Sequence, residues 1–245
     1  MSVGVFSLDR PTIGTWLPLA DPAVAEIMAA AGFEWLVVDL EHSLLTLETA
    51  GELIRVIELC GASPLVRLTS NDSDQIKRVM DGGAHGIIVP MVLSADDAAK
   101  AVAATRYPPA GTRGVGLGRA QRYGAGFEEY LSWQVDGPII IVQIEHRDSV
   151  ANLEAILAVP GIGGFIIGPY DLSASMGIPG QFDDPVFLEC METIRSTARR
   201  MGVPSGIHLV EPDVAALRQA VADGYSLIAY GVDFRFLDVT ARLGV

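Results

Sequence analysis

Two residue types that often carry chemistry or cross-links are scarce in this chain of 245 residues. It contains two cysteines, Cys60 and Cys190, and two lysines, Lys77 and Lys100. Both cysteines sit among apolar residues in helical patterns, so we expect buried free thiols and no disulfide framework. Neither lysine stands at the end of a predicted strand, where a Schiff-base nucleophile would be needed.

A net positive charge and long apolar runs are absent as well. A formal net charge of −13 argues against a nucleic-acid partner, which would favour a basic surface. A few local arginines or a metal could still attract a small anionic substrate. No stretch approaches the roughly 20 uninterrupted apolar residues of a membrane span. The start, MSVGVFSLDRPTIG, has no basic segment followed by a long apolar one, so we expect no signal peptide and a cytoplasmic protein.

Strand and helix patterns alternate along the whole chain, with no linker-like segment between them. The predicted strands are Thr12–Leu19, Trp35–His42, Pro64–Thr69, Gly86–Met91, Ile139–Glu145, Gly164–Gly168, Ser205–Val210 and Leu227–Val232. The predicted helices are Pro22–Ala31, Leu47–Cys60, Asp74–Asp81, Ala95–Thr105, Ser149–Ala158, Asp184–Met201, Pro212–Asp223 and Phe234–Leu243. Helix N-caps are expected at Asp21, Thr46, Ser94 and Asp148.

One helix per strand over this length is typical of a (β/α)8 TIM barrel, so we expect a single α/β domain over residues 1–245. An open doubly wound sheet is the alternative, and the lack of a G-x-G-x-x-G after the first strand disfavours it. Segment Tyr107–Tyr130 interrupts the alternation. It is too rich in glycine and proline for a regular element, so a structured loop packing on the barrel or a partner is expected.

Active sites of such barrels lie at the carboxyl ends of the strands, and these ends are rich in polar residues here. In chain order they are Trp16, Asp39, Glu41, His42, Arg67, Pro90, Gln143, Glu145, Asp171, His208 and Asp233. Glu145 and Asp171 follow adjacent strands, which lie about 4.8 Å apart, so their carboxylates could share Mg²⁺ or Mn²⁺. The alternative is that both acids cap helices.

Four further strand-end residues suggest catalytic or binding roles. Asp39 could orient the His42 imidazole and make it a better base, provided that the chain bends after Leu40. Arg67 in a barrel mouth needs an anion, which could be a substrate or a salt bridge to Glu41 or Glu145. Gln143 shares a strand face with Glu145 and could donate to substrate or water.

The remaining ionisable residues give weaker signals. His85 precedes a strand at the opposite face and is expected to be structural, while His146 should be solvated. His208 remains a candidate for the site. Asp81 ends a helix, where the dipole disfavours an acid, so some partner should hold it.

Four blocks of the sequence resemble the HpcH/HpaI aldolase family of divalent-metal-dependent (class II) pyruvate aldolases. They are GFEWLVVDLEH at Gly32–His42, Val66–Val92, YPPAGTRG at Tyr107–Gly114 and Val142–Gly177, which holds QIE and GPYDLS. The resemblance implies a (β/α)8 barrel that reversibly cleaves 4-hydroxy-2-oxo acids to pyruvate and an aldehyde.

The resemblance also implies roles for individual residues. Glu145 and Asp171 would hold the metal (Mg²⁺ or Mn²⁺, with Co²⁺ a further candidate), and Arg67 would stabilise the enolate. His42, paired with Asp39, would be the base. Pyruvate would be held by Arg67, Gln143, Gly168, Pro169 and Tyr170. The family's usual hexamer, with an element exchanged between subunits, would bring Asp81 and Arg119 near a neighbouring subunit's site.

The chain departs from the family pattern in two places. Tyr170 replaces a small residue in G-P-x-D, and SLLTLE follows His42 where better-known members have an APN-type sequence. These departures bear on the aldehyde half of the reaction. A CoA-thioester lyase of the citrate or malyl type and a non-catalytic keto-acid binding barrel are the alternatives.

Overall fold

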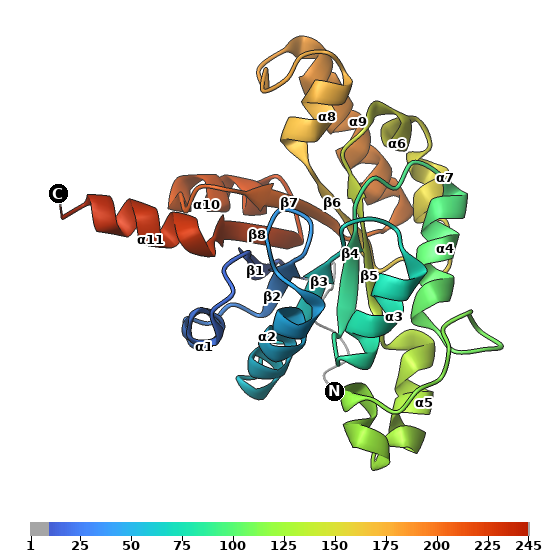
Figure 1. The fold of residues 1–245 in the computed structure, drawn as a ribbon. Helices are drawn as coiled ribbons and strands as arrows, with labels where there is room; N and C mark the ends of the chain where they lie inside the picture. Colours follow the sequence, from blue (N-terminus) through green and yellow to red (C-terminus); the bar gives the residue numbers. More distant parts are fainter. Residues whose placement is uncertain (1–9, 245) are drawn as a thin grey trace.

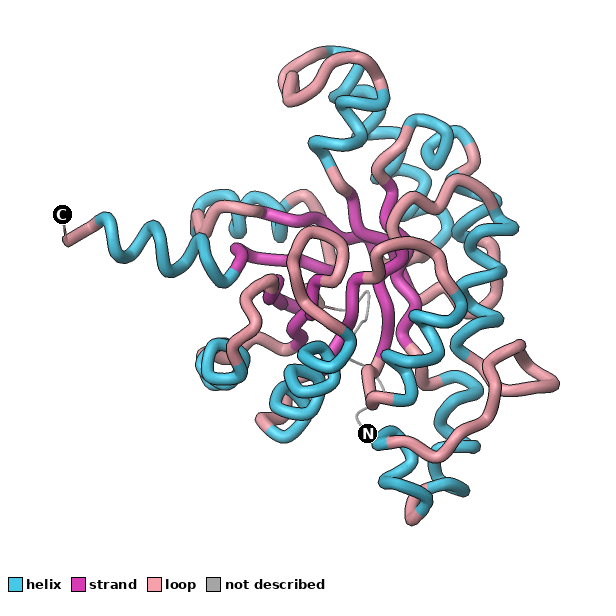
Figure 2. Tube along the Cα trace, in the orientation of Figure 1, coloured by secondary structure: helices cyan, strands magenta, loops and turns pink. Residues whose placement is uncertain are grey.

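The computed structural model describes residues 10–244 and contains a closed barrel of eight parallel strands, as predicted. Residues 1–9, on which part of the signal-peptide prediction rests, lie outside this range. The strands pair in chain order, and β1 closes on β8. They are β1 Thr12–Leu17, β2 Trp35–Asp39, β3 Ser63–Arg67, β4 Gly86–Val89, β5 Ile139–Ile144, β6 Gly164–Ile167, β7 Ser205–Leu209 and β8 Leu227–Val232. In Figure 2 the strands gather at the centre, with helices around them.

The helices follow the predicted order with several additions. They are α1 Pro22–Ala30, α2 Leu47–Leu59, α3 Ser73–Asp81, α4 Ala95–Thr105, the 3-10 helix η1 Arg119–Gly124, α5 Phe127–Asp136, α6 Arg147–Ala151, α7 Leu153–Leu157, α8 Pro169–Ser175, α9 Pro185–Met201, α10 Val214–Ala222 and α11 Asp233–Arg242. Within the described range, no helix has the length and apolar character needed to cross a membrane.

Capping side chains set several helix starts. Asp21, Thr46 and Ser94 each accept an amide hydrogen bond in the first turn, which confirms the prediction. The prediction for Asp148 was wrong, because Nδ1 of His146 accepts the Asp148 N–H at 3.1 Å and caps α6. The His146 side chain is 28% exposed and therefore less solvated than predicted.

The barrel interior is filled by its own apolar layer. Trp16, Trp35, Ile88, Ile141 and Ile166 belong to this inner cluster, while a larger cluster joins the outer faces of the strands to the helices. Gly14 makes room for the Trp35 indole, since a Cβ at Gly14 would lie 2.0 Å from that ring. The filled interior leaves the carboxyl ends of the strands as the place for a cavity.

Two sequence predictions fail because of local packing. Segment Tyr107–Tyr130 is not an irregular loop throughout: it contains η1 and the first part of α5. Cys60 is exposed at the C-terminus of α2, and Cys190 is only partly buried, so the expectation of two buried thiols was wrong.

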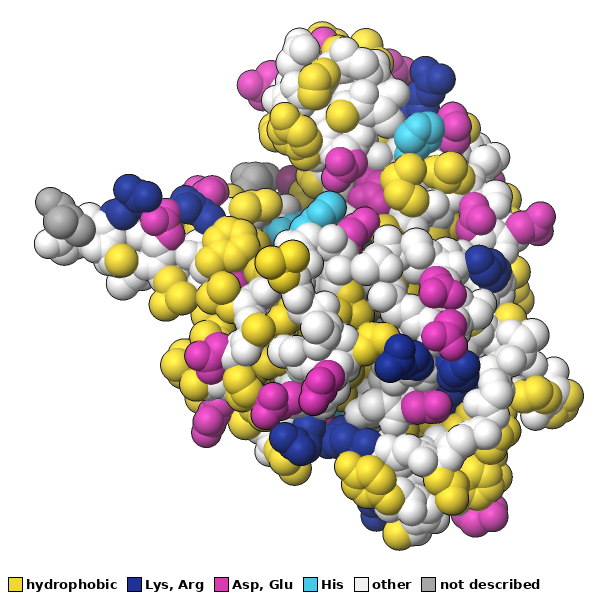
Figure 3. All heavy atoms as spheres, in the orientation of Figure 1, with side chains coloured by type: hydrophobic (Ala, Val, Ile, Leu, Met, Phe, Trp, Pro, Cys, Tyr) yellow, Lys and Arg dark blue, Asp and Glu magenta, His cyan; other side chains and the backbone are white. Residues whose placement is uncertain are grey.

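The last helix packs on the barrel through Phe236 and then extends away from it. In Figure 1, α11 extends away from the strands, and Figure 3 shows apolar and charged side chains interspersed along it. Phe234 and Leu237 on this helix, and Leu243 directly after it, are 44%, 56% and 83% exposed. These three apolar side chains therefore remain largely uncovered in the single chain.

Candidate active site

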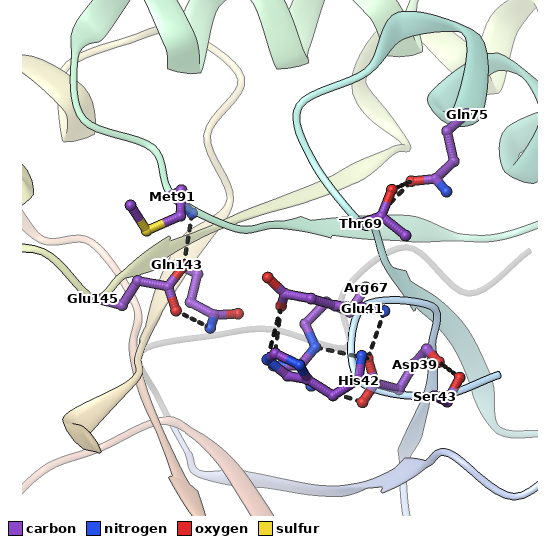
Figure 4. Close-up of polar contacts among 10 residues, drawn as sticks. All are labelled: Asp39, Glu41, His42, Ser43, Arg67, Thr69, Gln75, Met91, Gln143 and Glu145. Atoms are coloured by element: carbon purple, nitrogen blue, oxygen red, sulfur yellow. Dashed lines mark hydrogen bonds and ion pairs between the residues drawn. The ribbon is translucent and has the colours of Figure 1, made fainter. Parts of the chain in front are cut away.

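The polar strand ends converge on a cavity of about 230 Å³ at the carboxyl end of the barrel. It is lined by Trp16, His42, Arg67, Gln143, Ile166, Ile167, Gly168, Pro169, Tyr170, Asp171, His208 and Val210. Figure 4 shows the two polar groups that frame this region: Asp39, Glu41, His42 and Arg67 on one side, and Gln143 and Glu145 on the other. Most of the predicted site residues therefore lie together.

Arg67 and Asp39 form a bidentate ion pair on neighbouring strands. The β2–β3 register places the two residues side by side. Arg67 donates from Nε to Asp39 Oδ1 at 2.9 Å and from Nη2 to Oδ2 at 2.7 Å. Its guanidinium also lies over the Trp16 ring, 4.2 Å from the centroid. Two parallel hydrogen bonds and an aromatic face therefore fix the cation at the cavity wall.

The predicted pairing of Asp39 with the His42 imidazole is not found. The chain bends after Leu40, and Asp39 Oδ1 accepts the backbone N–H groups of Glu41 and His42, at 3.0 and 3.3 Å. Asp39 therefore orients Arg67 and shapes the turn. The nearest carboxylate to the imidazole is Glu41, whose Oε2 lies 3.8 Å from His42 Nε2 and 3.3 Å from Arg67 Nη1.

The acids around Arg67 have different protonation behaviour. Burial tends to raise the pKa of Asp39, but the hydrogen bonds and charge of Arg67 hold it below its usual value. Burial raises the pKa of Glu41 to about 7; the Arg67 charge opposes this, whereas Glu145, Asp39 and Asp171 add to it. Of the two carboxyl groups beside Arg67, Asp39 is therefore the one that stays ionised.

Glu145 is buried and held from two sides. Its Oε1 accepts the Met91 N–H at 2.7 Å, and its Oε2 accepts a short hydrogen bond from Gln143 Nε2. Met91 has a positive φ of 52°, which aims its amide at the carboxylate. Burial raises the pKa of Glu145, and the Asp171 charge contributes to the rise.

Glu145 and Asp171 offer carboxylate oxygens of the kind that bind a divalent cation. Asp171 lies in the first turn of α8 rather than on β6, yet its charge acts on both Glu145 and Glu41. Gln143 Oε1 is buried without a partner. Within residues 10–244 no three His, Cys, Asp or Glu side chains form a metal-holding group. Two carboxylates with water and substrate oxygens resemble a Mg²⁺ site more than a zinc site.

Gly168 leaves room beside these donors. A Cβ there would lie 3.1 Å from Glu145 Oε2 and 3.4 Å from Gln143 Nε2. Pro169 and Tyr170 follow at the start of α8 and line the same cavity, and the Tyr170 side chain is 63% exposed at its rim. The G-P-Y-D segment therefore forms one wall of the site.

His208 and Trp16 are also brought into the cavity. Their rings lie 5.1 Å apart, and His208 Nε2 and Trp16 Nε1 are both buried without a hydrogen-bond partner. The strand-end residue Asp233 has another use, because its carboxylate accepts the N–H groups of Leu19 and Phe234 at 3.0 and 2.6 Å. It is fully buried and supports the turn after β1.

Asp81 and Arg119 do not reach this chain's own cavity. Asp81 is held by Arg113, whose Nη2 lies 3.1 Å from Oδ1, which supplies the partner that the helix end required. Arg119 makes a short ion pair with Glu58 and lines a hollow of about 530 Å³ at the other end of the barrel. Figure 1 places α5, which lines this hollow, and α8 at opposite ends of the molecule. His85 belongs to the same end, 3.5 Å from Glu58, as expected for a structural histidine.

The function of Arg113 within the Y-P-P-x-G-x-R-G block was missed by the sequence analysis. This arginine is 2% exposed and donates to Tyr107 Oη and Tyr130 Oη at 3.0 and 2.7 Å, and to Thr105 O at 2.8 Å. Its guanidinium lies 4.4 Å from the Tyr107 ring centroid. Burial raises the pKa of Tyr130 to about 12, so Tyr130 stays neutral. The only sequence signal was an arginine among buried aromatic residues.

Comparison with known proteins decides the family. Residues 12–238 match the HpcH/HpaI aldolase/citrate lyase family. The chain belongs to this family. A relative from Salmonella typhimurium, named 4-hydroxy-2-oxo-heptane-1,7-dioate aldolase, is 42% identical over 243 residues, covering 96% of this chain and 91% of the relative.

Solved structures of the family share the fold. A family protein from Burkholderia cenocepacia superposes with a TM-score of 0.91 at 33% identity, covering 96% of this chain and 93% of that one. An HpcH/HpaI aldolase from Desulfitobacterium hafniense gives 0.87 at 33% identity, covering 96% and 91%. These matches confirm the resemblance seen in the sequence and the barrel it implied.

Proposed function

We propose that this protein is a class II aldolase that reversibly cleaves a 4-hydroxy-2-oxo acid to pyruvate and an aldehyde. The observation that carries the proposal is the buried Arg67, which Asp39 holds in place at the cavity wall. Asp171 lines the same cavity, and its charge acts on Glu145. A fixed cation on one side and paired carboxylates on the other suit a 2-oxo acid that becomes an enolate. The 42% identity to a named 4-hydroxy-2-oxo acid aldolase supports the same reaction.

A divalent cation is the proposed cofactor, and Glu145 and Asp171 are its proposed ligands. Each Glu145 oxygen accepts one hydrogen bond and keeps a lone pair free for a cation. Gln143 Oε1 is buried and has no hydrogen-bond partner. Hard oxygen donors favour Mg²⁺ or Mn²⁺, with Co²⁺ a further candidate. When bound, such an ion supplies Lewis-acid polarisation of the 2-oxo group.

Arg67 is the proposed oxyanion partner. Its Nη1 faces Glu41 at 3.3 Å, while Nε and Nη2 are committed to Asp39. Asp39 acts through Arg67 and is a positioning residue. A guanidinium fixed in advance stabilises charge that develops on the 2-oxo oxygen without reorganising during the reaction. Gln143, with the wall formed by Gly168, Pro169 and Tyr170, would hold the pyruvate unit.

His42 is the proposed base. It takes the proton from the 4-hydroxyl, the C3–C4 bond breaks, and the electron pair passes to the 2-oxo oxygen while the aldehyde leaves. Protonation at C3 then yields pyruvate. The imidazole is mostly exposed at the mouth, with Glu41 as its nearest carboxylate. We expect His42→Ala to lose roughly 10²–10⁴ in rate, the usual range for a general base.

A Schiff-base mechanism has no suitable lysine. Lys77 pairs with Asp74 at 2.7 Å on α3, and Lys100 on α4 donates to Asn71 O at 2.6 Å. Both are helical residues outside the cavity lining. Borohydride with pyruvate should therefore trap no covalent adduct, and a lysine adduct would overturn the metal-dependent proposal.

The test is an aldehyde panel with pyruvate, run with several divalent ions and after EDTA. We expect aldol formation that EDTA abolishes and Mg²⁺ or Mn²⁺ restores. Activity indifferent to both treatments would contradict the proposal. Cleavage of malyl-CoA without activity on 4-hydroxy-2-oxo acids would indicate the CoA-thioester lyase instead.

We also propose that the protein is a homo-oligomer, with a hexamer as the expected form. The exposed apolar residues Phe234 and Leu237 on α11, and Leu243 directly after it, would be covered by another copy. Asp81 and Arg119, remote from this chain's cavity, would then lie near a neighbour's site. Light scattering should give a mass several times 26.0 kDa, and a monomer would refute this arrangement.

A further inference from the structure

A buried arginine fixes the carboxylate at the end of α3. Arg113 is 2% exposed, and its Nη2 lies 3.1 Å from Asp81 Oδ1. The same nitrogen donates to Tyr107 Oη at 3.0 Å and to Tyr130 Oη at 2.7 Å, and both phenol rings face the guanidinium. Nη1 donates to Thr105 O at 2.8 Å. Partners on several sides give the guanidinium one orientation, so the position of Asp81 is set with it.

This ion pair sets a position more than it adds stability. Nε of Arg113 is buried without a hydrogen-bond partner, and Asp81 is the last residue of α3, where the helix dipole disfavours an acid. Burial raises the pKa of Asp81, and the charge of Arg113 opposes this rise. Apolar side chains of similar volume often replace a buried ion pair without loss of stability. A pair that is costly at both ends suits a carboxylate that is needed in one place.

Asp81 presents its second oxygen to the surface. Its side chain is 27% exposed, and in the described part of the chain its Oδ2 accepts no hydrogen bond. Two glycines let the chain pass close by: a Cβ at Gly116 would lie 3.9 Å from Oδ2, and one at Gly118 would lie 2.7 Å from the Asp81 carbonyl oxygen. Val115 and Leu117, on the same segment, are exposed. The carboxylate and these two apolar side chains form a surface that we call the Asp81 patch.

The mouth of the barrel complements the Asp81 patch. Leu44, Met91 and Tyr170 follow β2, β4 and β6 at the carboxyl end of the barrel, and all three are exposed apolar side chains. The His42 imidazole is exposed at the same mouth and can donate a hydrogen bond. Apolar side chains around a donor match apolar side chains beside a carboxylate. The two surfaces lie at opposite ends of the barrel, so only a second copy can bring them together.

We propose that Arg113 is a positioning residue for the active site of a neighbouring copy, where it acts through Asp81. Arg113 and its two tyrosines hold the carboxylate, and the Asp81 patch seats on the neighbour's mouth. This inference rests on the proposed aldolase function and the proposed homo-oligomer. It adds to them the residue that decides where the contributed carboxylate lies.

The experiment combines impaired variants in mixed oligomers and measures aldol formation with Mg²⁺ or Mn²⁺. Each site would use Arg67 of its own copy and the Arg113–Asp81 pair of a neighbour. Arg113→Met should lower kcat/KM by about 10- to 100-fold, as expected for a displaced group. Arg113→Met and Arg67→Met are then co-expressed with different affinity tags, and oligomers that carry both tags are isolated. With equal random mixing, roughly a quarter of the sites contain every wild-type group, so roughly a quarter of the wild-type rate should return.

A second mixture, of Arg113→Met with Asp81→Asn, identifies the copy in which Arg113 acts. Both residues would serve the neighbour from one copy, so this mixture contains no complete site and should recover no activity. The reverse pattern would overturn the proposal: recovery with Asp81→Asn but not with Arg67→Met would mean that Arg113 supports its own cavity. Absence of recovery in both mixtures would also overturn it.

Further variants keep the test valid if Arg113→Met folds poorly. Tyr130→Phe keeps the ring and removes one acceptor of the guanidinium, so it should lower kcat/KM about 3- to 10-fold, the share of one hydrogen bond. Mixing with Arg67→Met should rescue it in the same way. Arg113→Lys keeps the charge without the fork and should retain part of the rate. The control is Arg78→Met, which removes an exposed cation from the same helix and should leave the rate unchanged.

The wild-type protein separates this inference from the proposals on which it rests. Wild type that forms no aldol would refute the aldolase, and the role of Arg113 with it. Active wild type that light scattering shows to be a monomer would refute the contribution to a neighbour and retain the aldolase. An active oligomer with the reverse pattern of recovery would refute the role of Arg113 alone.

Discussion

Replacing Asp39 by Asn tests the ion pair that fixes Arg67. The amide keeps the size and one acceptor oxygen for the Glu41 and His42 amides but loses the charge that holds the guanidinium by two bonds. Removing one member of a buried pair costs about 3–5 kcal/mol. Glu41, 3.3 Å from Arg67 Nη1, offsets part of this, so we expect the free energy of unfolding to fall by about 2–4 kcal/mol.

The catalytic effect follows from a displaced guanidinium. A shift of about 1 Å can cost 10²-fold, so Asp39→Asn should lower kcat/KM by about 10- to 100-fold. Urea unfolding of the metal-free protein and initial rates with added metal provide the two measurements. A double-mutant cycle of Asp39→Asn with Arg67→Met should show strong coupling in both the free energy of unfolding and kcat/KM. A cycle of Asp39→Asn with His42→Ala should be close to additive in both quantities.

The opposite pattern would refute this reasoning. Strong kinetic coupling of Asp39 to His42, with additivity toward Arg67, would mean that the carboxylate orients the imidazole after all. Normal stability and rate in Asp39→Asn would mean that Glu41 alone can hold the guanidinium.

Three further perturbations test neighbouring parts of the site. Gly168→Ala should weaken metal binding about tenfold, because the added Cβ would lie 3.1 Å from Glu145 Oε2, while the φ of −100° accepts alanine. The control is Gly114→Ala, whose Cβ meets nothing within 4 Å and should leave metal binding unchanged. Equal metal-titration curves for the two variants would refute this prediction. Met91→Gly should raise the free energy of unfolding by about 0.5–1 kcal/mol, because glycine adopts the φ of 52° without strain and keeps the backbone N–H that binds Glu145. The lost side chain is half exposed and contributes little burial. A lower free energy of unfolding in this variant would contradict the prediction. Burial lowers the pKa of His208 from 6.5 to about 4, so as pH falls the unfolded chain takes up this proton before the folded chain does. The free energy of unfolding of wild type should therefore fall by on the order of 2–3 kcal/mol relative to that of His208→Leu between pH 6.5 and 4. Parallel stability curves for these two proteins would show that the imidazole is not buried.

Much of the fold followed from local patterns in the sequence. The alternation of apolar strands with amphipathic helices predicted all eight strands, but four of them end two or three residues earlier than predicted. The reason is visible at β2, where the chain leaves the ladder at Asp39 so that the acid can hold Arg67 and cap its own turn. Helix α5 was missed because the glycine-rich stretch before it concealed a start at Phe127.

Most residues that line the cavity could be predicted from the strand ends, but the contacts between them could not. Asp39, Arg67 and Gln143 stood at strand ends, yet the partner of Asp39 depends on the β2–β3 register, which a single sequence does not encode locally. The Met91 amide that holds Glu145 depends on a positive φ that methionine does not suggest. Such contacts arise between elements far apart in the chain.

The most direct test of the account is exchange of the pyruvate methyl protons for deuterium in D₂O, followed by NMR. The reaction requires an enolate but no aldehyde, so it isolates the step assigned to Arg67 and the Glu145–Asp171 pair. We expect exchange with Mg²⁺ or Mn²⁺, its loss with EDTA, and a fall of at least about 100-fold in Arg67→Met. Metal-dependent binding of pyruvate without any exchange, or exchange that Arg67→Met leaves unchanged, would contradict the account.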